Sequence, residues 1–86
     1  MFDPLDLPLP QIDPDAFVAP GTHIHGEVAI GRFAVIMFGA VIRAEADRVE
    51  VGAYTNIQDN SVLHCDAGLP CVVGERVTVG HAAVVH

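Results

Sequence analysis

The chain has no lysine and no tryptophan, and its four basic residues face eleven acidic ones, for a formal net charge of −7. It has no basic stripe to attract nucleic acid or an anionic membrane, so we expect neither partner. No apolar run approaches the roughly 20 residues of a transmembrane helix. The first ten residues carry two aspartates and three prolines where a signal peptide needs positive charge and an apolar stretch, so we expect a cytoplasmic protein.

Cysteine is also scarce, since only Cys65 and Cys71 occur. Disulfides are rare where thiols are kept reduced, and a disulfide here would close a very short loop, so we expect both thiols to stay free. The fold therefore has to be sought in the pattern of apolar residues.

That pattern is a six-residue repeat. An aliphatic residue recurs at a step of six in three runs: Val18, Ile24, Ile30, Ile36 and Ile42; Val51, Ile57 and Leu63; Val73, Val79 and Val85. Between the runs the step is nine and then ten, which indicates two short loops inserted into a regular ladder. Two places before each aliphatic position the residue is small or β-branched, as at Ala34 and Cys71. A fixed internal period is typical of a solenoid.

The period predicts an all-β fold, a parallel β-helix in which each hexapeptide gives one short strand and one turn. Three hexapeptides would make a triangular coil, with the aliphatic and small residues inside and their neighbours outside. An amphipathic helix is excluded because a spacing of six with glycine and proline throughout does not match the 3.6 period. A flat sandwich has no reason to keep a strict six.

The repeat also predicts the organisation of the chain. Residues 1–15 contain four prolines and are expected to form an extended arm over the lower end of the prism. Residues 16–86 are expected to form about three to four coils. Because the sequence stops in mid-coil, we expect this β-helix domain to be incomplete at its C-terminus, the N-terminal fragment of a longer protein.

The ladder predicts which side chains share an outward column. Successive aliphatic positions fall on the three faces in turn. Arg43, His64 and His86 each come directly after an aliphatic residue of the same face, so they are expected to share one outward column. His64 and His86 should then stack about 4.8 Å apart along the axis, close enough to hold one metal ion. His81 follows another face, above Asp59 and around a corner from the pair.

A third imidazole could come from a second subunit. In a three-fold assembly, His81 of one protomer could meet His64 and His86 of its neighbour, and the contact would repeat three times. Three imidazoles with a fourth position left to water are typical of a catalytic zinc site. Zinc held in this way makes hydroxide available near neutral pH.

Four segments of the chain resemble the gamma-class carbonic anhydrases: Val41-Ile42-Arg43, Thr55-Asn56-Ile57-Gln58-Asp59, Val62-Leu63-His64 and 79–86. The resemblance extends from about Ile12 to the end. It implies a left-handed β-helix, a homotrimer with metal sites at the subunit interfaces, and a lyase that hydrates CO2 reversibly to bicarbonate through a metal-bound hydroxide. It also implies His64, His81 and His86 as the ligands, with zinc as the metal, or iron or cobalt.

The same resemblance assigns roles to four polar residues. Gln58 and Asn56 fall on catalytic pocket positions, where they would position the hydroxide and CO2. Arg43 and Asp59 fall on a charge pair that holds protomers together at the interface.

The chain departs from the family pattern at two places. The usual Arg-Gly-Asp is Arg43-Ala44-Glu45 here, and the acidic loop after the first ligand is replaced by a short segment in which Asp66 is the one carboxylate. Glu45 and Asp66 are therefore the residues we expect to serve in proton transfer.

Two other functions stay open. Hexapeptide β-helices also act as acyltransferases, in which a histidine is the general base and coenzyme A lies between subunits. A non-catalytic structural trimer stapled by metal is the second alternative, since a fold does not by itself fix a function.

Overall fold

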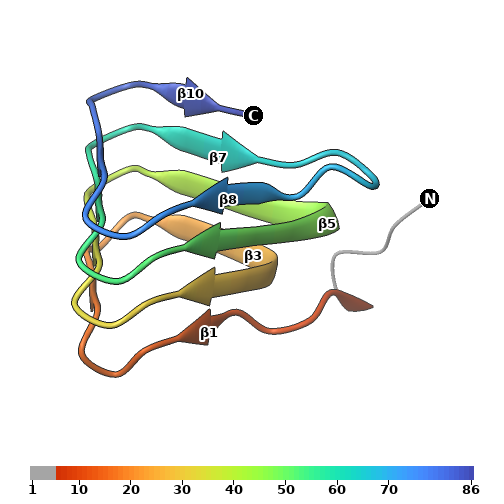
Figure 1. The fold of residues 1–86 in the computed structure, drawn as a ribbon, viewed down its shortest axis with the longest axis horizontal. Helices are drawn as coiled ribbons and strands as arrows, with labels where there is room; N and C mark the ends of the chain where they lie inside the picture. The colour runs from red at the N-terminus through yellow and green to blue at the C-terminus, as the bar shows by residue number, and fades with distance from the viewer. Residues whose placement is uncertain (1–5) are drawn as a thin grey trace.

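The computed structural model describes residues 6–86, and residues 1–5 of the predicted arm lie outside this range. Its strands, all paired in parallel, are β1 (Gln11–Ile12), β2 (Phe17–Val18), β3 (His23–Ile30), β4 (Val35–Ile36), β5 (Val41–Val51), β6 (Asn56–Ile57), β7 (Val62–His64), β8 (Cys71–Val73), β9 (Thr78–Val79) and β10 (Val84–Val85). Residues 6–86 contain no α-helix. The strands wind into about four stacked coils (Figure 1), which confirms the predicted all-β solenoid.

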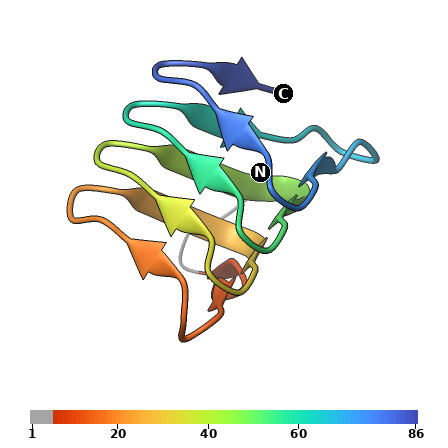
Figure 2. The same ribbon diagram turned by 60° about the vertical axis from the view of Figure 1, so that its left-hand side comes forward.

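Two sheets form the walls of the prism. Strands β2, β4, β6 and β9 stack into a four-stranded sheet that makes one face (Figure 2). The other sheet has the order β1-β3-β5-β7-β10, with β8 also beside β5. It covers two faces because β3 and β5 are long strands that run around the corner between them (Figure 1).

The strand register confirms the predicted rotation of the three faces. Val18 pairs with Ile36 and Ile57 with Val79 on one face; Ile24, Ile42, Leu63 and Val85 align on the second; Ile30, Val51 and Val73 align on the third. The ladder also continues below the predicted boundary at residue 15, since Ile12 pairs with Ile30. Ile12 lies six residues before Val18, so β1 follows the same period as the coils above it.

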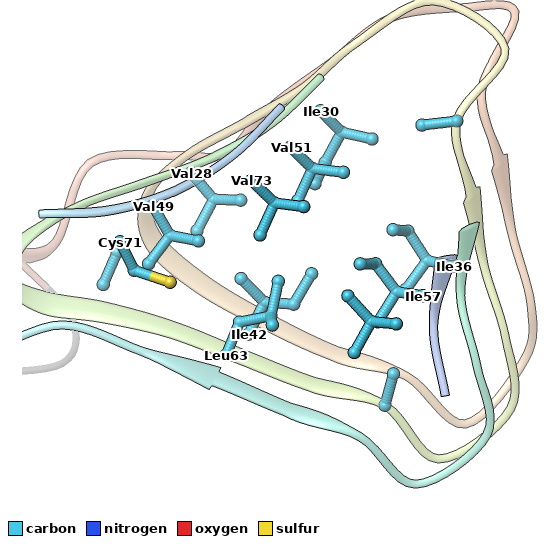
Figure 3. Close-up of a cluster of buried hydrophobic side chains, with 14 of the residues drawn as sticks. Val28, Ile30, Ile36, Ile42, Val49, Val51, Ile57, Leu63, Cys71 and Val73 are labelled. Atoms are coloured by element: carbon cyan, nitrogen blue, oxygen red, sulfur yellow. The ribbon is translucent and has the colours of Figure 1, made fainter. Parts of the chain in front are cut away.

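The aligned aliphatic side chains fill the interior of the prism (Figure 3). Ile36, Ile42, Ile57 and Leu63 are completely buried. Figure 3 also shows Cys71 in line with Val28 and Val49, so this thiol fills the core as predicted. The period of six thus places one apolar layer on the next, and burial of these layers is the main source of stability.

Tight turns make two of the three corners. Phe33, Tyr54 and Arg76 occupy equivalent turns at one corner with φ of 57°, 60° and 56°. Coils approach each other closely beside these turns: a Cβ on Gly52 would lie 2.5 Å from the backbone of Gly74. Glycine is needed at position 52 because no side chain fits there.

Both inserted loops lie at the third corner, between the second and third faces. The first lies within β5, where the register with β3 shifts between Gly26 and Val28. The second joins β7 to β8 and projects from the coil (Figure 1). It is closed by a bridge in which Leu69 N donates to Asp66 O at 2.9 Å. In the part of the chain described, no helix has the length and apolar character to cross a membrane.

Candidate metal centre

His64 and His86 lie in one outward column. His64 pairs with Arg43, and the pairing of Leu63 with Val85 sets His86 beside His64 in the next coil. The two imidazole rings have centroids 5.2 Å apart and planes inclined by 16°. This stacking confirms the predicted column, and it follows from the register because both histidines come one residue after a buried aliphatic position.

Asp66 lies with the two histidines. One ligand atom from each of His64, Asp66 and His86 can be chosen so that all three lie within 4.8 Å of one another. His86 Nε2 is 3.3 Å from Asp66 Oδ2. The sequence predicts Asp66 as a proton-transfer residue. It did not predict that the Asp66 carboxylate would lie within reach of the imidazoles of His64 and His86. The available signal was its position two residues after His64, which favours the same side of an extended chain.

Glu45 supports the same site. His64 Nε2 hydrogen-bonds Glu45 Oε1, and both side chains are largely shielded from solvent. A carboxylate bonded to one nitrogen of a histidine ring fixes the orientation of that ring. Glu45 is thus placed to position His64, whereas its expected part in proton transfer stays a prediction.

His81 lies on a different face. Its side chain is 72% exposed, and its Nδ1 is 3.6 Å from Asp59 Oδ1. The peptide N–H of Ala82 donates to Asp59 O at 2.9 Å, so the turn that carries His81 stacks on the turn below. As the ladder predicted, His81 does not join the cluster of His64 and His86 within one chain.

The two expected pocket residues lie on the face of His81 and not on that of His64. Gln58 Nε2 donates to Asn56 Oδ1 at 2.8 Å, and both side chains are half-buried. Asn56 pairs with Thr78 in the sheet of β2, β4, β6 and β9. One protomer therefore keeps the amide pair and the histidine column apart.

Arg43 lies in the histidine column, paired with His64 above and with His25 below. Its side chain is exposed, and within residues 6–86 it forms no ion pair with Asp59. The predicted pairing of these two residues across an interface concerns a contact between chains and stays a prediction.

Behind the column, inside the prism, lie the two free thiols. Cys65 and Cys71 are both buried. Burial raises the pKa of the Cys71 thiol, a nearby charge on Cys65 raises it further, and a hydrogen bond with the His64 backbone lowers it. A buried thiol with a raised pKa is a poor nucleophile and a poor metal ligand, so Cys71 acts as a core side chain.

The donor set on the outer side fits a metal ion. Imidazole nitrogen and carboxylate oxygen are both ordinary ligands of zinc and of the other first-row divalent metals. The three side chains are exposed or half-buried, so an ion can reach them from solvent.

No family model matches the chain. The chain is 45% identical over 83 residues to gamma carbonic anhydrase 3, mitochondrial, of Arabidopsis thaliana, which covers 90% of this chain and 32% of that protein. It is 41% identical over 76 residues to a probable carbonic anhydrase of Methanocaldococcus jannaschii, covering 88% of this chain and 48% of that protein. The crystal structure of a hexapeptide transferase family protein from Anaplasma phagocytophilum matches with a TM-score of 0.82 and 45% identity, over 87% of this chain and 43% of that chain.

The stacked coils and the six-residue ladder define a hexapeptide-repeat β-helix. Over 87–90% of its length the chain is similar to hexapeptide-repeat proteins, among them relatives named as carbonic anhydrases. It spans between about a third and a half of the length of the two curated relatives.

Proposed function

We propose that this chain is part of a metal-dependent carbonic anhydrase-like enzyme that hydrates CO2 reversibly to bicarbonate. The observation that carries the proposal is the stacked pair of His64 and His86, with ring centroids 5.2 Å apart on the outside of the prism. Relatives named as carbonic anhydrases, at 41% and 45% identity, support it.

In the proposed site, His64 and His86 of one protomer and His81 of the partner subunit hold the metal in a homotrimer. The separation of His81 from the other two histidines within one chain supports a site shared between subunits. We propose zinc, with iron or cobalt as alternatives, because imidazole suits all three. When bound, such a metal lowers the pKa of a water ligand to about 7.

The remaining residues have distinct tasks in the proposal. Gln58 and Asn56 orient CO2 through their amide groups, which a mutual hydrogen bond of 2.8 Å holds side by side. Hydration of CO2 to bicarbonate releases one proton, which a nearby carboxylate has to accept and pass to solvent. Asp66, exposed beside His86, and Glu45, bonded to His64, are the two carboxylates in place.

Arg43 and Asp59 hold the protomers together in this proposal. Arg43 is exposed and pairs with His64 in the strand register, and Asp59 Oδ1 lies 3.6 Å from His81 Nδ1. A subunit contact that joins the two histidine faces would also join these two charges. A pairing of this kind sets the register between subunits.

The experiment that tests the function measures three quantities on one preparation: metal per protomer, mass in solution and the rate of CO2 hydration by stopped flow. We expect one ion per protomer, a trimer and a rate above the uncatalysed one. His64→Ala should lose both the metal and the rate. His23→Ala is the matched control, because it removes an exposed histidine on β3 that does not belong to the cluster.

Two results would replace this function with another. A trimer that keeps its metal and shows no hydration would be the structural alternative, in which metal only joins subunits. Metal-independent acetyl transfer from acetyl-coenzyme A would support an acyltransferase, in keeping with the transferase family to which the matching Anaplasma phagocytophilum protein is assigned.

A further inference from the structure

A pair of histidines on β3 lies outside the metal centre. His23 and His25 alternate with Ile24, which packs against the core, so both imidazoles project from the outer surface of the prism. Their ring centroids are 6.4 Å apart and their planes are inclined by 13°. We propose that His23 and His25 chelate a further divalent metal ion, with Cu²⁺ bound most tightly.

This pair cannot share an ion with His64. Arg43 lies between them in the strand register, paired with His25 on one side and with His64 on the other. His25 and His64 are therefore two coils apart, which is about 9.6 Å along the axis. Donor atoms bound to one ion lie only about 3 to 3.5 Å apart. An ion held by the pair on β3 is thus a separate one.

Both rings are available as ligands. The other three histidines, His64, His81 and His86, each lie against a carboxylate. Within residues 6–86, the ring nitrogens of His23 and His25 have no hydrogen-bond or ion-pair partner, and both side chains are exposed. Imidazole nitrogen is the commonest metal ligand in proteins, and nothing in the described part of the chain competes for it here.

The strand holds the two rings at a spacing that one ion can span. Residues i and i+2 of a strand lie about 6.6 Å apart on the same side, which accounts for the 6.4 Å between the ring centroids. Two imidazoles bound to one ion have centroids about 5 Å apart. Rotation of the two exposed side chains can close this difference, while β3 stays fixed by its pairing with Val41 and Arg43 of β5.

With two protein ligands, the pair makes a weaker site than three histidines do. Arg43, opposite His25, repels a cation, whereas the net charge of −7 on the whole chain attracts one. The affinity of nitrogen ligands for divalent first-row metals peaks at Cu²⁺, so this ion should bind most tightly. An ion held by two imidazoles exchanges with solvent and is lost on gel filtration. It therefore does not add to the one ion per protomer expected of the purified protein.

The test adds Cu²⁺ to the His64→Ala variant, which lacks a ligand of the metal centre. Calorimetric titration gives the affinity, and broadening of amide NMR signals by paramagnetic Cu²⁺ gives the place of binding, expected at His23–His25. Loss of a group that only orients a ligand weakens metal binding about 10- to 100-fold, so His64→Ala/His23→Ala should bind at least 10-fold more weakly than His64→Ala. His64→Ala/His81→Ala is the matched control, because it removes an exposed histidine on another face, and should bind Cu²⁺ as His64→Ala does.

Two results would overturn the inference: equal affinity of His64→Ala and His64→Ala/His23→Ala for Cu²⁺, or broadening centred away from β3. Circular dichroism checks that each variant keeps the coil. If His64→Ala does not fold, the same NMR comparison between the unaltered chain and His23→Ala decides the matter, since broadening at His25 should disappear in the variant. The proposed function fails on a different measurement, because a chain that does not hydrate CO2 can still bind Cu²⁺ at β3.

Discussion

The buried hydroxyl of Thr55 connects two coils: its Oγ1 donates to Gly74 O at 2.5 Å and accepts from Val77 N at 3.1 Å. One side chain thereby satisfies both ends of the turn in the coil above. Ser61 makes the first of these two bonds at a second corner, where its hydroxyl donates to Gly80 O at 2.6 Å.

Replacing Thr55 with valine should destabilise the chain although the shape is kept. The substitution removes both hydrogen bonds of the Thr55 hydroxyl, to Gly74 O and from Val77 N, and a hydrogen bond contributes about 0.5–1.5 kcal/mol to stability. Chemical denaturation gives the free energy of unfolding. Thr78→Val on the exposed side of β9 is the control and should change it by less than about 0.5 kcal/mol. Equal effects of the two variants would contradict a structural role for the Thr55 hydroxyl.

Gly52→Ala should lower the free energy of unfolding, whereas Gly74→Ala should leave it nearly unchanged. A Cβ at position 52 would lie 2.5 Å from Gly74 backbone atoms, whereas at position 74 it would meet nothing within 4 Å. Forcing coils apart in a packed interior costs about 1–3 kcal/mol, measured as a fall in the free energy of unfolding. If the two alanine variants were equally stable, the close approach of the coils at this corner would be wrong.

The buried side chain of Leu63 is expected to contribute strongly to the stability of the fold. Its side chain is 0% exposed within the aligned aliphatic layers, so Leu63→Ala should cost about 2–5 kcal/mol. Val84, one residue before the equivalent position in the next coil, is 71% exposed. Val84→Ala should therefore leave the unfolding midpoint nearly unchanged, and a large loss there would mean that its side chain is covered in solution.

The raised pKa of Cys71 predicts a loss of stability in alkali. Below the ordinary thiol range, about pH 8.5, both the folded and the unfolded states are protonated and the group contributes nothing. Above it the unfolded state ionises first, because burial raises the pKa in the folded state, and the free energy of unfolding falls. The unfolding midpoint of the unaltered chain should fall more steeply with pH than that of Cys71→Ala. Parallel pH profiles would contradict the prediction.

Glu45→Gln should weaken metal binding without removing a ligand. Glu45 bonds His64 Nε2, and loss of such an orienting carboxylate costs about 10- to 100-fold in metal affinity. Titration with Co²⁺ measures the change. Glu27→Gln, which neutralises an exposed carboxylate on β3, is the control and should bind as the unaltered chain does. Unchanged affinity of Glu45→Gln would mean that the contact with His64 does not serve the metal.

The sequence predicted the prism and the histidine column well because both follow from one number, the step of six. Once the step is known, the alternation of a strand gives the inward and outward sides, and three faces in rotation give the stacking of His64 on His86. The separation of His81 followed from the same count. None of this required knowledge of a loop conformation.

The parts that the sequence did not predict depend on turns. The place of Asp66 beside His86 depends on the bridge between Asp66 and Leu69 and on the positive φ of Gly68, which no period determines. The bond between Glu45 and His64 likewise depends on the path of β5 around its corner. At the lower end, Ile12 pairs with Ile30 and continues the ladder into the segment that the prolines indicated as an extended arm.

The chain varies in length at one corner only. From the second face to the third, the step between aliphatic positions grows from six after Ile24 to nine after Ile42 and ten after Leu63, while the other two corners keep six in every coil. Residues can therefore be gained or lost beside His64 without shifting the register of any face. The length of this corner can therefore alter the surroundings of His64 while the prism that carries it stays the same.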